Sequence, residues 1–181
     1  MGTWRTRLDG FLYSCSKYII FFDIGDYYED NYVLEDFYIL MEKYNLDSLK
    51  MIFRLISSYS YLDYSKIIFH VYRDSKIVYG IKDIEQLNTQ VFDGWGNIWN
   101  RIIRANIFTN SLNLVNDKVL NIYQNKADDL YYNIIVNKVS FNFLIIERVG
   151  YVYYYDGKGE GTPRFSNEHL RNKAIQQYVS D

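Results

Sequence analysis

The sequence predicts a single α+β domain over residues 1–181, with a mainly antiparallel sheet of five or six strands and helices packed on one face. Three observations lead to this fold class. Of the 181 residues, 49% are hydrophobic and 23% are charged, which is typical of a folded domain of ordinary size. Runs rich in β-branched and aromatic residues recur along the chain, separated by short polar turns. Between them lie stretches whose apolar residues are three or four positions apart, as in helices.

The first third of the chain is predicted to form one strand and two helices. The apolar run over residues 17–24 is too short to span a membrane and is typical of a buried strand. A helical period of apolar residues, with acids at its start that complement the helix dipole, predicts a helix over residues 28–44. Asp47 is predicted to cap a second helix that continues to about Tyr59, because the apolar residues after it share one side.

The middle of the chain is predicted to contain a hairpin and two helices. Residues 66–73 and 76–81 are β-rich runs joined by a two-residue polar turn. Apolar residues three or four positions apart then predict a helix from Asp83 to Ile102, with a break at its glycines. A short helix is expected over residues 117–124.

The C-terminal third is predicted to form a three-stranded antiparallel meander. Its strands are residues 130–136, 139–147 and 151–156. The dipeptides Asn137-Lys138 and Val149-Gly150 between them fit two-residue hairpin turns. In this register one face carries the apolar side chains of the core, and the other carries tyrosines and hydrogen-bonding groups.

Composition restricts the class of function. The chain holds 20 Tyr and 11 Phe, and it has 21 Ile and 16 Asn against only 3 Ala and 1 Pro. Residues with AT-rich codons are thus enriched together, which indicates an AT-rich genome. The net charge of −2, without a block of like charges, gives no strong nucleic-acid signature. Cys15 has no partner for an internal disulfide and no membrane span is expected, so we predict an intracellular, cytoplasmic protein.

The arrangement of the tyrosines, rather than their number, predicts a binding surface. The tyrosine-rich face of the meander is expected to be exposed, together with an acidic aromatic patch around residues 26–30. Tyrosine combines a large, stiff apolar body with a polar tip, which suits recognition. The expected partner-binding residues are Tyr131, Asn133, Asn142, Arg148, Tyr151, Tyr153, Tyr155, Tyr27, Glu29 and Asp30.

From these features we predict a non-enzymatic protein-binding module that acts by blocking a partner protein. Immunity proteins against toxins, and viral or phage antagonists of host factors, work in this way. The acidic patch favours a basic partner. The sequence contains no coherent catalytic set, metal-ligand cluster or cofactor motif, so no catalytic residue, metal or cofactor is predicted for this function.

The alternative is a small hydrolase or nuclease that uses His169 and Arg164. These residues have an R-x4-H spacing, which resembles the motif of the HEPN ribonucleases and implies RNA cleavage. HEPN domains are helical, whereas this chain is rich in predicted strands. A third reading is a single-strand nucleic-acid binder that stacks bases on the tyrosine face. Assays of the protein on RNA and DNA, with and without divalent metal and beside His169→Ala, test the hydrolase or nuclease alternative.

Overall fold

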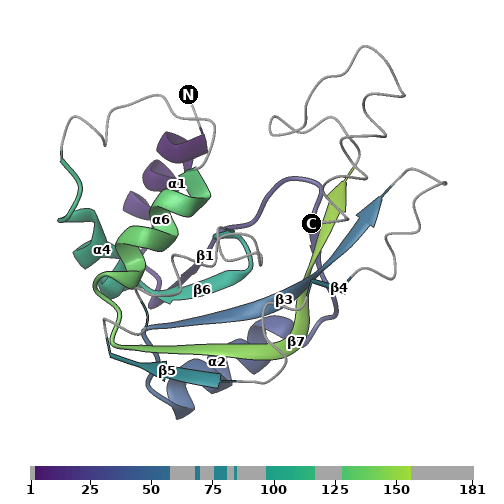
Figure 1. Ribbon diagram of the computed structural model, residues 1–181. Coiled ribbons are helices and arrows are strands. Elements are labelled where there is room, and N and C mark those ends of the chain that lie inside the picture. Colours follow the sequence, from purple (N-terminus) through teal and green to yellow (C-terminus); the bar gives the residue numbers. More distant parts are fainter. Residues whose placement is uncertain are drawn as a thin grey trace.

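A computed structural model describes residues 3–57, 68–69, 76–80, 84, 97–116 and 128–155. These residues form four helices around one sheet, so the α+β class is confirmed (Figure 1). The helices are α1 (Thr3–Leu12), α2 (Val33–Lys43), α4 (Ala105–Leu112) and α6 (Asp128–Asn137). The strands are β1 (Tyr18–Ile20), β2 (Tyr27–Tyr28), β3 (Ser48–Ser57), β4 (Ile68–Phe69), β5 (Lys76–Tyr79), β6 (Arg101–Arg104) and β7 (Asn142–Tyr155).

The sheet is mixed, so the prediction of a mainly antiparallel sheet is wrong. Its strand order is β1-β6-β3-β7-β2, with β4 paired to β3 and β5 paired to β7. The two longest strands, β3 and β7, lie side by side and run parallel from the Ser48–Phe143 pair to the Ser57–Tyr155 pair. A parallel pair requires a long crossover connection. The helices and strands between residues 57 and 142 form that crossover, and the remaining described pairs are antiparallel.

Helices cover both faces of the sheet, not one face as predicted. Helix α2 packs on the face that carries Leu49 and Met51 of β3. Helices α1, α4 and α6 pack on the other face around Ile103 of β6 (Figure 1). The neighbouring Ile102 belongs to the first core and Ile103 to the second, because successive side chains of a strand point to opposite faces.

Residues 48–57 form strand β3, not the predicted helix. All residues from 48 to 53 are buried, as expected for a central strand that is covered on both faces. Such a strand lacks the alternation of apolar and polar residues, so its apolar run also fits a helix. Asp47 does not cap a helix. Its carboxylate accepts hydrogen bonds from the amides of Phe141 and Asn142, at 2.6 and 3.2 Å, and so fixes the start of β7.

The predicted meander is wrong as well, because helix α6 and one continuous strand take its place. Residues 130–136 lie in α6, and Val149 and Gly150 lie inside β7 rather than in a turn. Gly150 serves close packing, since a Cβ at this position would lie 2.3 Å from the Met51 sulfur and 2.7 Å from Phe37 Cζ. The pairing of β7 with β3 shifts register on both sides of Ile52, which marks a bulge beside this contact.

Two of the three elements predicted for the first third of the chain are confirmed in shorter form. The strand over residues 17–24 is present as β1, and the helix over residues 28–44 is present as α2, which begins at Val33 after β2. No helix was predicted from the sequence for residues 3–12, which form α1. Its apolar face is short, with only Trp4 and Leu8 buried, which explains why the pattern gave little signal.

The middle of the chain differs from its prediction. The described parts of the expected hairpin do not pair with each other, because β4 pairs with β3 and β5 with β7. The helix predicted to reach Ile102 is wrong at its end, where β6 and α4 follow one another. The helix expected over residues 117–124 lies outside the described residues. Within the described ranges, no helix is long and apolar enough to cross a membrane.

Candidate functional site

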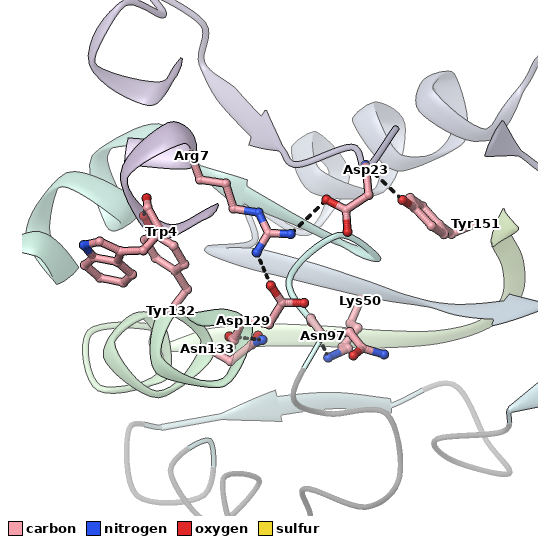
Figure 2. Close-up of polar contacts among 9 residues, drawn as sticks. All are labelled: Trp4, Arg7, Asp23, Lys50, Asn97, Asp129, Tyr132, Asn133 and Tyr151. Atoms are coloured by element: carbon pink, nitrogen blue, oxygen red, sulfur yellow. Dashed lines mark hydrogen bonds and ion pairs between the residues drawn. The ribbon is translucent and has the colours of Figure 1, made fainter. Parts of the chain in front are cut away.

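Helices α1 and α6 and the loop after β1 bring one arginine and two aspartates together. Arg7 of α1 contacts Asp129 of α6 through Nη1, and its Nη2 lies 2.9 Å from Asp23 Oδ1 (Figure 2). The Arg7 side chain is only 10% exposed, whereas those of Asp129 and Asp23 are 23% and 40% exposed. A nearly buried guanidinium thus holds two carboxylates that solvent can reach.

An aromatic contact fixes the positions of these helices. The Trp4 ring of α1 stacks on Tyr132 of α6 with 4.2 Å between ring centroids, and the Tyr132 hydroxyl donates to the Trp4 carbonyl at 2.9 Å. Both side chains are fully buried. Arg7 follows Trp4 by three residues and Asp129 precedes Tyr132 by three, so each charged residue lies about one helical turn from the stack. The stack therefore aligns the guanidinium with the carboxylate.

Lys50 of β3 lies beyond Asp129, as Figure 2 shows. Its side chain is completely buried, and its ammonium group donates to the Asn97 carbonyl at 2.9 Å. Burial lowers the pKa of Lys50 well below its ordinary value, and the positive charge of Arg101 lowers it further, while Asp129 acts in the opposite direction. The negative charge of Asp129 therefore favours the protonated form of Lys50.

Arg101 of β6 is the second buried cation. It donates to Asn133 Oδ1 at 2.8 Å and to the Ser48 hydroxyl at 2.6 Å, and its guanidinium lies 4.5 Å from the Phe143 ring centroid. Burial lowers the pKa of Arg101 to about 9, so it stays charged at neutral pH. Asn133 also donates to the Asp129 carbonyl at 2.9 Å, which ties Arg101 to the helix turn that presents Asp129.

The ten predicted partner-binding residues do not form one surface within the described part of the chain. Tyr151 and Asn133 are buried, at 0% and 3% exposure, and Tyr131 packs edge-on against Trp4 at 5.2 Å. Four more residues are half-buried, namely Asn142, Arg148, Tyr153 and Glu29, and two are exposed, namely Tyr27 and Asp30. The side chain of Tyr155 is not among those that the structure describes. The predicted face does not exist because residues 130–136 are helical, so the binding role of these residues stays a prediction.

The acids of the predicted patch are paired within the chain. Glu29 lies 2.6 Å from Arg54, and Arg148 lies 3.1 Å from Asp30 and 2.7 Å from Asp36. Such pairs satisfy much of the negative charge that was expected to attract a basic partner.

The sequence patterns did not predict Arg7, Asp23 or Asp129 as site residues. The two residues of the nuclease alternative, Arg164 and His169, lie outside the described ranges. A signal was present for Lys50, which stands between the apolar residues Leu49 and Met51 in a β-rich run, whereas Arg101 shares the short strand β6 with Arg104 and follows Asn100. A buried charge in such a run requires partners from elsewhere in the fold. In the described parts of the chain, no three His, Cys, Asp or Glu side chains gather to hold a metal ion.

Comparison with known proteins identifies a shared fold. The sequence matches no protein-family model and no curated protein sequence. The chain is similar to the crystal structure of S. aureus TarS 1–349 in complex with UDP-GlcNAc, with a TM-score of 0.63 and 13% identity over 99% of this chain and 47% of that one. A second crystal structure of TarS 1–349 gives a TM-score of 0.56 and 11% identity, over 98% of this chain and 50% of that one. The chain thus spans about half the length of these structures, and the likeness shows the fold alone.

Proposed function

We propose that the chain takes part in glycosyl transfer from a nucleotide sugar, with Asp129 as the general base. The observation that carries this proposal is the pairing of Asp23 and Asp129 on one guanidinium, that of Arg7, in a fold shared with TarS. TarS is a glycosyltransferase and was crystallised with UDP-GlcNAc. A solvent-accessible carboxylate that is held in place by a buried guanidinium can act as a general base.

The chemistry assigns one role to each of the three side chains. In glycosyl transfer, an acceptor hydroxyl attacks the anomeric carbon while a carboxylate removes its proton, and the bond to the nucleotide breaks with its electron pair. Asp129 is exposed enough to reach such a hydroxyl. Arg7 orients the Asp129 carboxylate, and Asp23 in turn holds the other nitrogen of the guanidinium.

The test is release of UDP from UDP-GlcNAc with water as the acceptor of the sugar, measured beside binding of the same compound. Asp129→Asn should lower release by about 10²–10⁴-fold, the range for loss of a general base, and should leave binding within about threefold. Asp36→Asn is the matched control, because Asp36 is an ion-paired aspartate on α2, which packs on the opposite face of the sheet. A chain that neither binds UDP-GlcNAc nor releases UDP, or an Asp129→Asn variant with full activity, would overturn the proposal.

Blocking of a partner protein is the second proposal. It now depends on exposed aromatic side chains next to the β2–β7 pair: Tyr27, one of the predicted residues, is 45% exposed, and Tyr154, which was not among them, is 42% exposed. Affinity purification from the native cell should recover a partner protein, and Tyr27→Ala should weaken its capture without a change in the unfolding free energy. Equal capture by both forms would remove this surface from the proposal.

A further inference from the structure

The loop that carries Asp23 is closed on itself. The Asp26 amide donates to the Asp23 carbonyl at 3.3 Å, and Gly25 between them has a φ of +98°, a conformation that favours glycine. The Asp26 carboxylate then accepts a hydrogen bond from the Tyr154 amide of β7 at 2.8 Å. The turn of residues 23–26 is therefore a defined unit that is attached to the sheet.

The Tyr151 hydroxyl lies between the two ends of this turn. It donates to Asp26 Oδ2 at 2.6 Å and accepts from the Asp23 amide at 3.2 Å, a contact that Figure 2 shows. The Tyr151 side chain is fully buried, and its ring packs against Trp99 and Phe22 with centroid distances of 4.5 and 5.6 Å. These rings fix the phenol, so its oxygen sets where the backbone of the turn lies.

We propose that Tyr151 is a positioning residue that acts on Asp129 through Asp23 and Arg7. Each link of this path is a contact of the structure: the hydroxyl holds the Asp23 backbone, the Asp23 carboxylate holds Arg7 Nη2, and Arg7 Nη1 holds Asp129. The role of Asp129 rests on the proposed function, whereas the attachment of the turn does not. Tyr151 never contacts the reacting atoms in this scheme.

Burial and hydrogen bonding keep the Tyr151 hydroxyl protonated, so it can donate to Asp26. Burial raises the pKa of Tyr151 above its ordinary value, and the hydrogen bond to Asp26 raises it further. The phenol therefore keeps its proton at neutral pH and remains the donor to Asp26. Burial also raises the pKa of Asp26, while the hydrogen bonds from Tyr151 and the Tyr154 amide act against that shift.

Tyr151→Phe removes only the oxygen and tests the path. The hydroxyl makes two hydrogen bonds, and loss of the one that it accepts from the Asp23 amide corresponds to about a tenfold effect. Hydrogen exchange at the Asp23 amide, measured by NMR on the full chain, should become about tenfold faster, and the carbon resonance of the Asp129 carboxyl should shift. Turnover of UDP-GlcNAc should fall about tenfold in kcat with an unchanged KM. Tyr28→Phe is the control, because Tyr28 packs edge-on against Tyr151 at 6.4 Å and should leave all three readouts unchanged.

A double variant separates positioning from general loss of structure. Asp23→Asn weakens the link to Arg7, so Tyr151→Phe in that background should lower kcat no further. Losses that add, or an Asp23 amide whose exchange does not change in Tyr151→Phe, would overturn the inference. If the wild-type chain releases no UDP, the proposed function fails by itself. The Asp23 exchange rate and the Asp129 resonance then decide whether Tyr151 positions these groups.

Discussion

Replacing Gly150 by alanine tests the close approach of α2 to β7. The added Cβ would lie 2.3 Å from the Met51 sulfur and 2.7 Å from Phe37 Cζ, well inside van der Waals contact. These neighbours are 1% and 0% exposed, so neither can turn into solvent. Overpacking a core costs about 1–3 kcal/mol. Because two side chains must move together here, we expect a loss near the upper end, about 3 kcal/mol.

Urea unfolding, followed by tryptophan fluorescence, measures this loss. The free energy of unfolding should fall while its slope with urea stays constant, since the surface exposed on unfolding does not change. Gly10→Ala is the matched control, because Gly10 lies in α1 and, apart from its chain neighbours and the backbone of its own helix, no atom lies within 4 Å of the added Cβ. There the same substitution should stabilise the protein by about 0.5–1 kcal/mol, as expected for a helix interior.

A second variant identifies the cause of the loss. Met51→Ala alone should cost about 2–5 kcal/mol. In the double variant the new methyl group at position 150 enters the space that Met51 leaves, so the combined loss should be smaller than the sum by about 1 kcal/mol or more. If Gly150 served a turn, removing the Met51 side chain would bring no relief. Additive losses, or a Gly150→Ala cost below about 0.5 kcal/mol, would refute the packing argument.

Three further predictions concern polar contacts. Burial raises the pKa of Asp26 above the ordinary 3.8, so this carboxyl contributes stability that is complete below pH 3.8 and is lost as pH rises through the raised pKa. Asp26→Asn should remove this pH dependence when urea unfolding is measured at a series of pH values. An unchanged profile would contradict Asp26 as its source. Asn133→Leu removes the acceptor of Arg101 Nη1, while the hydrogen bond from Nη2 to the Ser48 hydroxyl remains, and should cost about 3 kcal/mol because Arg101 is a buried charge. Asn133→Asp should restore most of that stability, and equal losses in the two variants would argue against the contact. Asp47→Ala removes the acceptor of two amides at the start of β7 and should cost about 1–3 kcal/mol, whereas Asp47→Asn, which keeps an acceptor, should cost less.

The sequence patterns predicted elements whose neighbours are close along the chain. The helix now seen as α2 was predicted from a rough period through Tyr32, Leu34, Tyr38, Ile39 and Met41. Its buried stripe is Val33, Phe37 and Met41, so the helix was predicted but the face that it buries was not. Helix α6 had a comparable signal in Tyr132, Ile135 and Val136, which are all buried. Its β-branched residues and the tyrosines around them favoured a strand instead. The segment is helical despite this strand propensity, because burial of Tyr132, Ile135 and Val136 on one side of α6 stabilises the helix.

The pairing of β3 with β7 and the contact between Arg7 and Asp129 were beyond sequence reasoning. Arg7 and Asp129 are 122 residues apart, and no local pattern relates them. Their approach depends on the stack of Trp4 on Tyr132 and on the packing of α1 and α6 on the same face of the sheet. Lys50 carried a local signal, a lone charge among apolar residues, but its partner could be named only from the fold.

The parallel pair at the centre of the sheet also constrains how the chain folds. Ser48 pairs with Phe143 across 95 residues, so the central ladder cannot close until both strands are available. Pairings of such long range carry a high contact order and form slowly. Until β7 docks, β3 presents an apolar edge, with Leu49, Met51 and Phe53 uncovered, that can pair with other chains. During refolding this edge is the segment where aggregation is expected to begin.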